Sequence, residues 1–178
     1  MKEIAPEHAM KLTHPLERFH VYQRSTNDCG PYCIAMVSNG LYRAPLVNAV
    51  ALANELSQRG LPERIPGWAT LPWGVVAAFR RLGLHARWRF GVRLTRLFDN
   101  LRQNLITIVA LGEPLRFEAR KWNGWSHYKI LDAWEPDRGL GFVDPATSNP
   151  TGMTWQDIEE FRREWTWMGR QIIEVWGP

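Results

Sequence analysis

The chain has 178 residues, 45% of them hydrophobic, which is enough to bury the core of one domain. Its 22 basic and 18 acidic residues give a net charge of +4, but the basic residues are scattered rather than gathered into one stripe, so we expect no nucleic-acid partner. Only two cysteines occur, Cys29 and Cys33, which excludes the disulfide framework of a small secreted fold.

The N-terminal part gives no sign of a targeting or anchoring segment. No stretch approaches the roughly 20 apolar residues of a membrane-spanning helix, and the N-terminus lacks the apolar run of a secretory signal. We therefore expect a soluble, cytoplasmic protein with no membrane span. Pro6 and Pro15 interrupt any helix in the first 20 residues, where strand pairing is not expected. We divide the chain into an irregular segment, residues 1–17, and one domain, residues 18–178.

Three helices are predicted in the first half of the chain. Apolar residues within Gly30–Val37 indicate a short buried helix that ends at Asn39-Gly40. A second helix is predicted over Pro45–Arg59, because proline suits a first turn and a broad apolar face follows it. A third is predicted over Pro72–Leu82. We expect all three to pack against the core.

The pattern then changes toward strands. Leu84–Phe90 alternates apolar and polar residues, as a half-buried strand does. A helix is predicted over Leu94–Arg102. It precedes Leu105–Leu111, the most β-prone run in the chain, which indicates a central strand.

The last part of the chain is predicted to form a hairpin, a helix and a final strand. His127–Trp134 and Leu140–Val143 flank strong turn residues and therefore read as paired strands. Thr154 is predicted to cap a helix over Trp155–Arg163, and Gln171–Trp176 is predicted to be a strand. Helices first and antiparallel strands later favour an α+β fold.

Cys29 lies at the predicted start of the first helix. A cysteine nucleophile must react as the thiolate, and the helix dipole favours negative charge at this position. Asp28 is predicted to cap the first backbone amides, and Gly30 to leave room for a substrate. The alternative is a buried structural cysteine, a description that fits Cys33, one turn deeper, better than Cys29.

One of the five histidines is the candidate general base. His8, His14 and His20 lie in or near the irregular leader, and His85 lies beside arginines, so all four are expected at the surface. His127 opens a predicted strand, which would hold its imidazole rigidly at the edge of a cleft.

Two carboxylates compete to orient that imidazole. Asp132 is an odd number of residues from His127, so its side chain is expected on the opposite face of the strand. The predicted hairpin brings Asp144 within about two residues of the position facing His127, at a cross-strand distance of about 5 Å if the two pair directly. Asp144 is therefore preferred, although an Asp-Pro pair can also simply end a strand and start a turn.

Gln23, six residues before Cys29, is the candidate oxyanion donor. Its side-chain amide could act together with the backbone amide of Cys29. An exposed loop glutamine is the alternative. No metal is expected, because a zinc site built from Cys29, Cys33 and His127 lacks a fourth ligand at the usual spacing. No cofactor is expected either, since no phosphate-binding glycine loop is evident.

These residues carry a family resemblance. Gln23–Met36, with the sequence QRSTNDCGPYCIAM, resembles the active-site signature of the papain-like cysteine peptidases that process bacteriocin and peptide precursors after a double-glycine leader. The match includes the glutamine-to-cysteine spacing, the acidic residue before the cysteine, the glycine after it and the later methionine. His127–Leu131 and Phe142–Ala146 resemble the family's histidine strand and aspartate-proline segment. The resemblance extends loosely over residues 18–176.

The resemblance implies a papain-like fold in which a helical part bears the cysteine and an antiparallel sheet bears the histidine and the aspartate. It implies a cysteine peptidase with Cys29 as nucleophile and His127 as base. Asp144 would orient the base, and Gln23 would donate to the oxyanion. A peptide or protein substrate, with or without a double-glycine leader, is implied. A separate transporter is a candidate partner, and no particular oligomeric state is indicated.

Two departures from the family pattern stand out. Members that mature exported peptides are commonly the first domain of a transporter chain, and no membrane or ATP-binding part is evident here. The basic region Arg87–Arg96 and the tryptophan-rich approach to His127, with Trp122, Trp125 and Trp134, have no assigned counterpart. Acyl or peptidyl transfer by the same residues, and a non-catalytic peptide-binding module, are the alternative functions.

Overall fold

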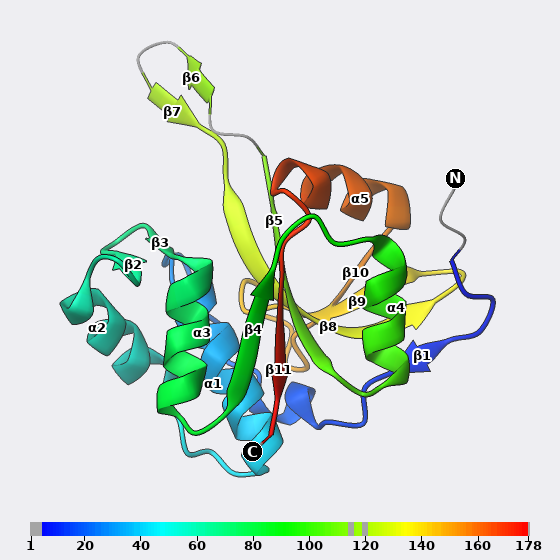
Figure 1. The fold of residues 1–178 in the computed structure, drawn as a ribbon, viewed down its shortest axis with the longest axis horizontal. Helices are drawn as coiled ribbons and strands as arrows, with labels where there is room; N and C mark the ends of the chain where they lie inside the picture. The colour runs from blue at the N-terminus through cyan, green and yellow to red at the C-terminus, as the bar shows by residue number, and fades with distance from the viewer. Residues whose placement is uncertain (1–4, 114–115, 119–120, 178) are drawn as a thin grey trace.

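The structure is a computed structural model that describes residues 5–113, 116–118 and 121–177. It has a mixed architecture of helices and an antiparallel sheet, as the sequence predicted (Figure 1). The helices are η1 (Leu16–Phe19), α1 (Cys29–Tyr42), α2 (Ala49–Arg59), α3 (Pro72–Arg81), α4 (Leu94–Arg102) and α5 (Ile158–Trp167). No helix among the described residues is both long and apolar enough to cross a bilayer.

A seven-stranded sheet forms the centre of the molecule. Six strands follow the order β10-β9-β8-β5-β11-β4, every neighbouring pair is antiparallel, and β1 pairs with β8 beside this path. The strands of this sheet are β1 (Met10–Lys11), β4 (His85–Arg89), β5 (Ile106–Gly112), β8 (Ser126–Glu135), β9 (Gly139–Val143), β10 (Met153–Gln156) and β11 (Ile172–Trp176). Two short hairpins, β2 (Arg64–Ile65) with β3 (Ala69–Thr70) and β6 (Arg116–Glu118) with β7 (Lys121–Asn123), lie outside it.

Most of the predicted elements are confirmed. α4 has the predicted bounds, and α3 differs from its prediction by one residue. β5 lies inside the sheet and is buried along its whole length, as expected of a central strand. β8 and β9 form the predicted hairpin. β4 and β11 pair with each other at one side of the sheet.

The first helix is longer than predicted. α1 continues through Asn39-Gly40 to Tyr42, and it ends at Arg43, whose φ of 53° is left-handed. Asn39 does not break the helix, because its side chain exchanges hydrogen bonds of 2.8 and 3.0 Å with the backbone of Val47. Gly40 packs against Leu16, since a Cβ there would lie 2.5 Å from Leu16 Cδ2. Both residues serve packing rather than termination.

Two other predicted helix starts are wrong. α2 begins at Ala49 instead of Pro45, because Asn48 caps it by accepting a hydrogen bond of 3.0 Å from the Ala51 amide. α5 begins at Ile158, and its cap is Asp157 rather than Thr154. The residues before Asp157 form β10, which is held extended by pairing with β9.

The N-terminal segment also differs from expectation. Residues 10 and 11 form β1, which pairs with β8 in the register Met10 to Trp134 and Lys11 to Ala133. The expectation that this part of the chain does not pair was wrong, because its partner lies more than 120 residues away in sequence. The division of the chain after residue 17 stays a prediction.

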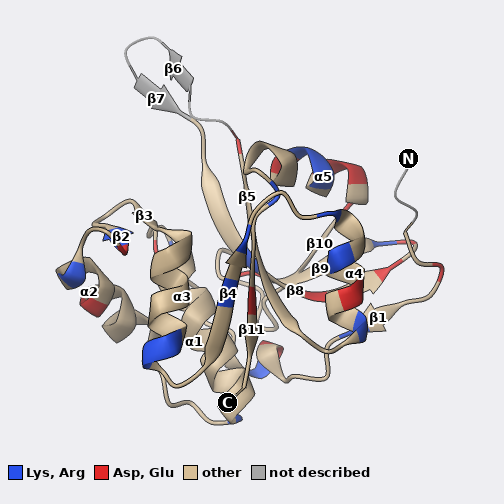
Figure 2. Ribbon diagram, in the orientation of Figure 1, with Lys and Arg blue, Asp and Glu red and all other residues tan. Residues whose placement is uncertain are grey.

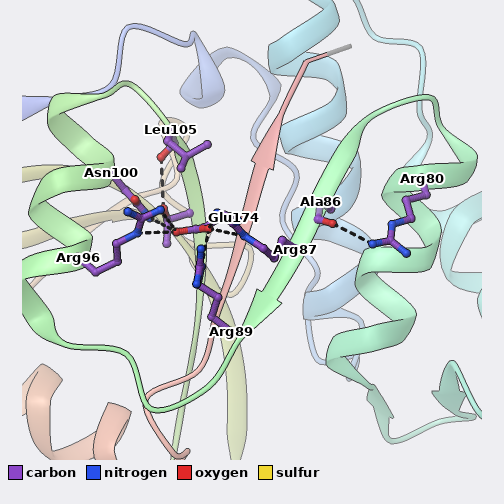
Figure 3. Close-up of polar contacts among 9 residues, drawn as sticks. Arg80, Ala86, Arg87, Arg89, Arg96, Asn100, Leu105 and Glu174 are labelled. Atoms are coloured by element: carbon purple, nitrogen blue, oxygen red, sulfur yellow. Dashed lines mark hydrogen bonds and ion pairs between the residues drawn. The ribbon is translucent and has the colours of Figure 1, made fainter.

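The basic region after residue 86 is organised around one buried carboxylate, that of Glu174 on β11. Oε2 accepts hydrogen bonds from Arg87 at 2.6 Å and Arg89 at 2.9 Å, while Oε1 accepts from Arg96 at 2.8 Å and from Asn100 at 3.2 Å (Figure 3). These contacts tie β4 and α4 to β11. Figure 2 shows the remaining basic residues spread over several elements.

The helical part meets the sheet along α1 and α3. α1 contacts β8, and α3 contacts β4 and β11 (Figure 1). Cys33, Ile34, Met36 and Val37 of α1 are buried in the core that these elements share. Because α1 is packed along its length, its first residue is held at a fixed place beside the sheet.

Candidate active site

Cys29 is the first residue of α1 and is half-buried. It opens onto a cavity of about 550 Å3 that Gln23 and His127 also line. Two of these residues come from the segment around the start of α1, and His127 comes from the sheet, nearly one hundred residues later. The cavity therefore lies where the helical part and the sheet meet.

His127 links the cysteine to a carboxylate. Its Nε2 lies 2.7 Å from Oδ1 of Asp144, and the Cys29 sulfur lies within hydrogen-bonding reach of the same ring. Because Nε2 is engaged with Asp144, the ring nitrogen that remains for the sulfur is Nδ1. The structure thus brings together the three residues that the sequence predicted as nucleophile, base and orienting carboxylate.

The contacts of His127 favour its charged form. Burial lowers its pKa, but hydrogen bonds with Asp144 and with Cys29 more than compensate, and the pKa rises from 6.5 to about 9. For Asp144, burial raises the pKa, but the contacts with His127, Lys129 and the Ala146 amide lower it to about 2. At neutral pH the pair is therefore an imidazolium beside a carboxylate.

Asp144 is held from several directions. Oδ1 also accepts a hydrogen bond of 2.8 Å from the Ala146 amide, and Oδ2 lies 3.2 Å from Nζ of Lys129. Its carbonyl oxygen lies 3.0 Å from Nε2 of His20. β9 ends just before Asp144, so the residue both ends the strand and faces His127. His20, predicted at the surface, is half-buried in this contact.

Asp132 has a different environment from Asp144. Its Oδ2 lies 3.7 Å from Nζ of Lys11, and a register shift interrupts the β8–β9 pairing between Leu131 and Ala133. Burial raises the pKa of Asp132 to about 6, a trend that Lys11 opposes. Asp132 thus makes no contact with His127 among the described interactions.

Asp28 does not cap α1 as predicted. Its carboxylate makes no hydrogen bond to the backbone of the helix and instead pairs with Arg64, which is almost fully buried. The same guanidinium donates to Ser57 and to the hydroxyl of Thr70. Arg64 thereby joins the residue before Cys29 to the β2–β3 hairpin, a contact that no local sequence signal indicates.

Gly30 also differs from its predicted role. A Cβ on this residue would lie 2.7 Å from Cβ of Thr70, a distance that real side chains do not reach. The space beside the glycine is therefore filled by the hairpin and not kept open for a substrate.

Gln23 is buried rather than an exposed loop residue. Its Nε2 donates to the Thr26 carbonyl at 2.9 Å, and its backbone amide donates to the Pro145 carbonyl at 2.8 Å. A primary amide has two N–H groups, so one stays for a group in the cavity. Its role as oxyanion donor stays a prediction.

Cys33 is fully buried, and its sulfur contacts the Tyr128 carbonyl at 3.4 Å. Burial raises the pKa of this thiol well above its ordinary value, which keeps it in the unreactive form. Cys29 is therefore the cysteine with access to the cavity.

Aromatic side chains form much of the cavity wall. They come from five separate segments of the chain: Trp68, Trp73, Trp88, Phe90, Trp125 and Trp167. Of the three tryptophans noted near His127, Trp125 lines the cavity, whereas Trp134 is buried against Phe98 in the core. The side chain of Trp122 lies outside the described residues. Sequence spacing could not reveal this wall, because folding assembles it from helices, a strand and loops that are distant in the sequence.

No protein-family model matches the sequence, and no curated protein matches it either. Solved structures do match, over nearly the whole chain. A C39-like peptidase from Bacillus anthracis has a TM-score of 0.68 at 15% identity, covering 95% of this chain and 98% of that one. The peptidase domain of Streptococcus ComA, a bi-functional ABC transporter of a quorum-sensing pathway, has a TM-score of 0.59 at 25% identity, covering 95% and 99%.

A third match is a double-glycine motif protease from an AMS/PCAT transporter, solved in complex with the leader peptide. Its TM-score is 0.58 at 18% identity, and the match covers 97% of this chain and 98% of that one. Together the matches show that the chain has the papain-like fold of C39-like and double-glycine peptidase domains, as the resemblance implied.

Proposed function

We propose that this protein is a cysteine peptidase that hydrolyses peptide bonds with Cys29 as its nucleophile. The observation that carries the proposal is the position of His127, which holds the Asp144 carboxylate at 2.7 Å and lines the same cavity as Cys29, within hydrogen-bonding reach of its sulfur. The shared fold with peptidase domains supports the same reaction class.

The proposed reaction starts from a thiolate beside the His127 imidazolium. The thiolate attacks the substrate carbonyl and forms a tetrahedral oxyanion, toward which the free N–H of Gln23 and the Cys29 backbone amide would donate. His127 gives its proton to the leaving amine as the C–N bond breaks, which leaves a thioester on Cys29. His127 then takes a proton from water, and the hydroxide attacks the thioester and releases the acid.

Asp144 would keep the imidazole in the useful orientation throughout. Its hydrogen bond to Nε2 directs Nδ1 toward the sulfur, and its charge stabilises the imidazolium. The position of Cys29 at the start of α1 adds the positive end of the helix dipole.

The proposed substrate is a peptide precursor with a double-glycine leader, processed in the cytoplasm with a separate transporter as partner. Support comes from the transporter peptidase domain and the leader-peptide complex among the similar structures. The aromatic wall of the cavity fits an apolar peptide segment.

The test is incubation with a peptide library that includes double-glycine precursors, read by mass spectrometry. Cys29→Ala should abolish cleavage, while Cys33→Ala, at the buried cysteine one turn away, should retain it. Added glycinamide separates hydrolysis from acyl transfer, because a transferase would yield the amide in place of the acid. Equal cleavage by wild type and Cys29→Ala would reject the assignment.

A further inference from the structure

Lys129 makes a contact that no motif in the sequence indicates. Its Nζ lies 3.2 Å from Oδ2 of Asp144, the carboxylate oxygen that His127 does not use. Lys129 follows His127 by two positions on β8, so strand alternation places both side chains on one face. Nζ also lies 5.7 Å from the centre of the Phe142 ring, on the neighbouring strand.

We propose that Lys129 is a positioning residue that fixes the Asp144 carboxylate for His127 and balances its charge. The proposal rests on the peptidase function above.

Lys129 fixes the orientation of the Asp144 carboxylate. His127 and the Ala146 amide both hold Oδ1, so these two contacts leave Oδ2 to be fixed by something else. Lys129 supplies that contact, and the carboxylate plane is then defined by both oxygens. Only 7% of the Asp144 side chain and 17% of the Lys129 side chain are exposed, so water has little access to replace the ammonium.

Lys129 also balances the charge of the site. In the reactive form the thiolate of Cys29, the imidazolium of His127, the carboxylate of Asp144 and the ammonium of Lys129 sum to zero. Without Lys129 the same partly buried group carries a charge of −1, which low-polarity surroundings disfavour. The other titratable groups nearby are His20, at the Asp144 carbonyl, and Cys33 and Tyr128 beside Cys29. Among the described residues Lys129 pairs with no other carboxylate.

The positive charge of Lys129 also affects how readily His127 releases its proton. Lys129 attracts the carboxylate that would otherwise act on His127 alone, so the imidazolium releases its proton more readily with Lys129 present. The proposed reaction needs such release, because His127 must act in turn as acid and base.

The test follows the titration of His127 by NMR in protein labelled at histidine. In Lys129→Met, and in Lys129→Gln if the Met variant does not fold, the midpoint of His127 should move upward by about one pH unit. Lys129→Arg keeps the cation and should stay near wild type. Lys11→Met is the matched control, because Lys11 also contacts a buried carboxylate of β8, that of Asp132. It should leave the His127 midpoint in place.

An unchanged midpoint in Lys129→Gln, or an equal shift in Lys11→Met, would overturn the proposal. This readout needs no substrate, so it judges Lys129 even if no peptide is cleaved and the proposed function itself fails. Where cleavage is observed, kcat should fall about tenfold in Lys129→Met with KM little changed, and Lys129→Arg should restore it. A loss that Lys129→Arg does not restore would contradict the role of the charge.

Discussion

Replacing Asp144 by asparagine should disable the proposed acid. Asp144 makes the larger of the contacts that raise the pKa of His127 to about 9 against burial. Without the carboxylate, only Cys29 opposes the effect of burial, so the pKa of His127 should fall from about 9 toward its ordinary value of 6.5. A full return to 6.5 would correspond to about 3 kcal/mol of lost stabilisation of the imidazolium. At about pH 7.5 the protonated fraction would fall from about 97% to about 10%.

The assay is kcat/KM against pH for a cleaved peptide. The loss of imidazolium alone costs about tenfold at pH 7.5, and the loss of the orienting hydrogen bond should increase it to about a hundredfold or more. Asp132→Asn is the matched control, since Asp132 is a buried carboxylate that contacts Lys11 and not His127. Equal pH profiles for wild type and Asp144→Asn would refute the reasoning.

Three further predictions concern stability and the start of α1. Glu174→Gln should lower the free energy of unfolding by about 3 kcal/mol in urea titrations, because it leaves three arginines around an uncharged amide. Burial raises the pKa of Glu174 but its arginines lower it to about 2, so its contribution is present above pH 4.5 and is lost as the pH falls through 2. Wild type should therefore lose more stability than Glu174→Gln between pH 5 and 2, and parallel losses would contradict this. Arg64→Met should lower the free energy of unfolding by about 3 kcal/mol and reduce cleavage, because it leaves the Asp28 carboxylate without its cation beside Cys29. An unchanged urea midpoint would contradict a stabilising role for Arg64. Gly30→Ala should lower the free energy of unfolding by about 1 to 3 kcal/mol, because its Cβ would clash with Thr70. A free energy of unfolding equal to that of wild type would contradict this clash.

The sequence predicted those parts of the fold that depend on local patterns. α4 has the predicted bounds because its apolar residues recur with helical spacing and are buried, among them Leu94, Leu97 and Leu101. The β8–β9 hairpin follows from turn residues that lie between two β-prone runs. That hairpin brings Asp144 to within two residues of the position opposite His127, near enough for the side chains to meet.

Contacts between distant segments could not be predicted in this way. β10 was expected to be helical, because nothing local shows that β9 holds it extended. Asp28 was expected to cap α1, because its partner Arg64 lies 36 residues away and makes a stronger, charged contact. Lys129 was passed over because the exact register of the hairpin, with Ile130 opposite Val143, was not predictable, and it is this register that continues to Lys129 opposite Asp144.

The most direct test of the proposed chemistry is to trap the covalent intermediate. Acid quenching during cleavage of a peptide, followed by digestion and mass spectrometry, should find the acyl part of the substrate as a thioester on the fragment that contains Cys29. It should be absent from Cys29→Ala and should build up more slowly in Asp144→Asn. Cleavage that proceeds with no adduct on Cys29, or with the adduct on another residue, would contradict the account.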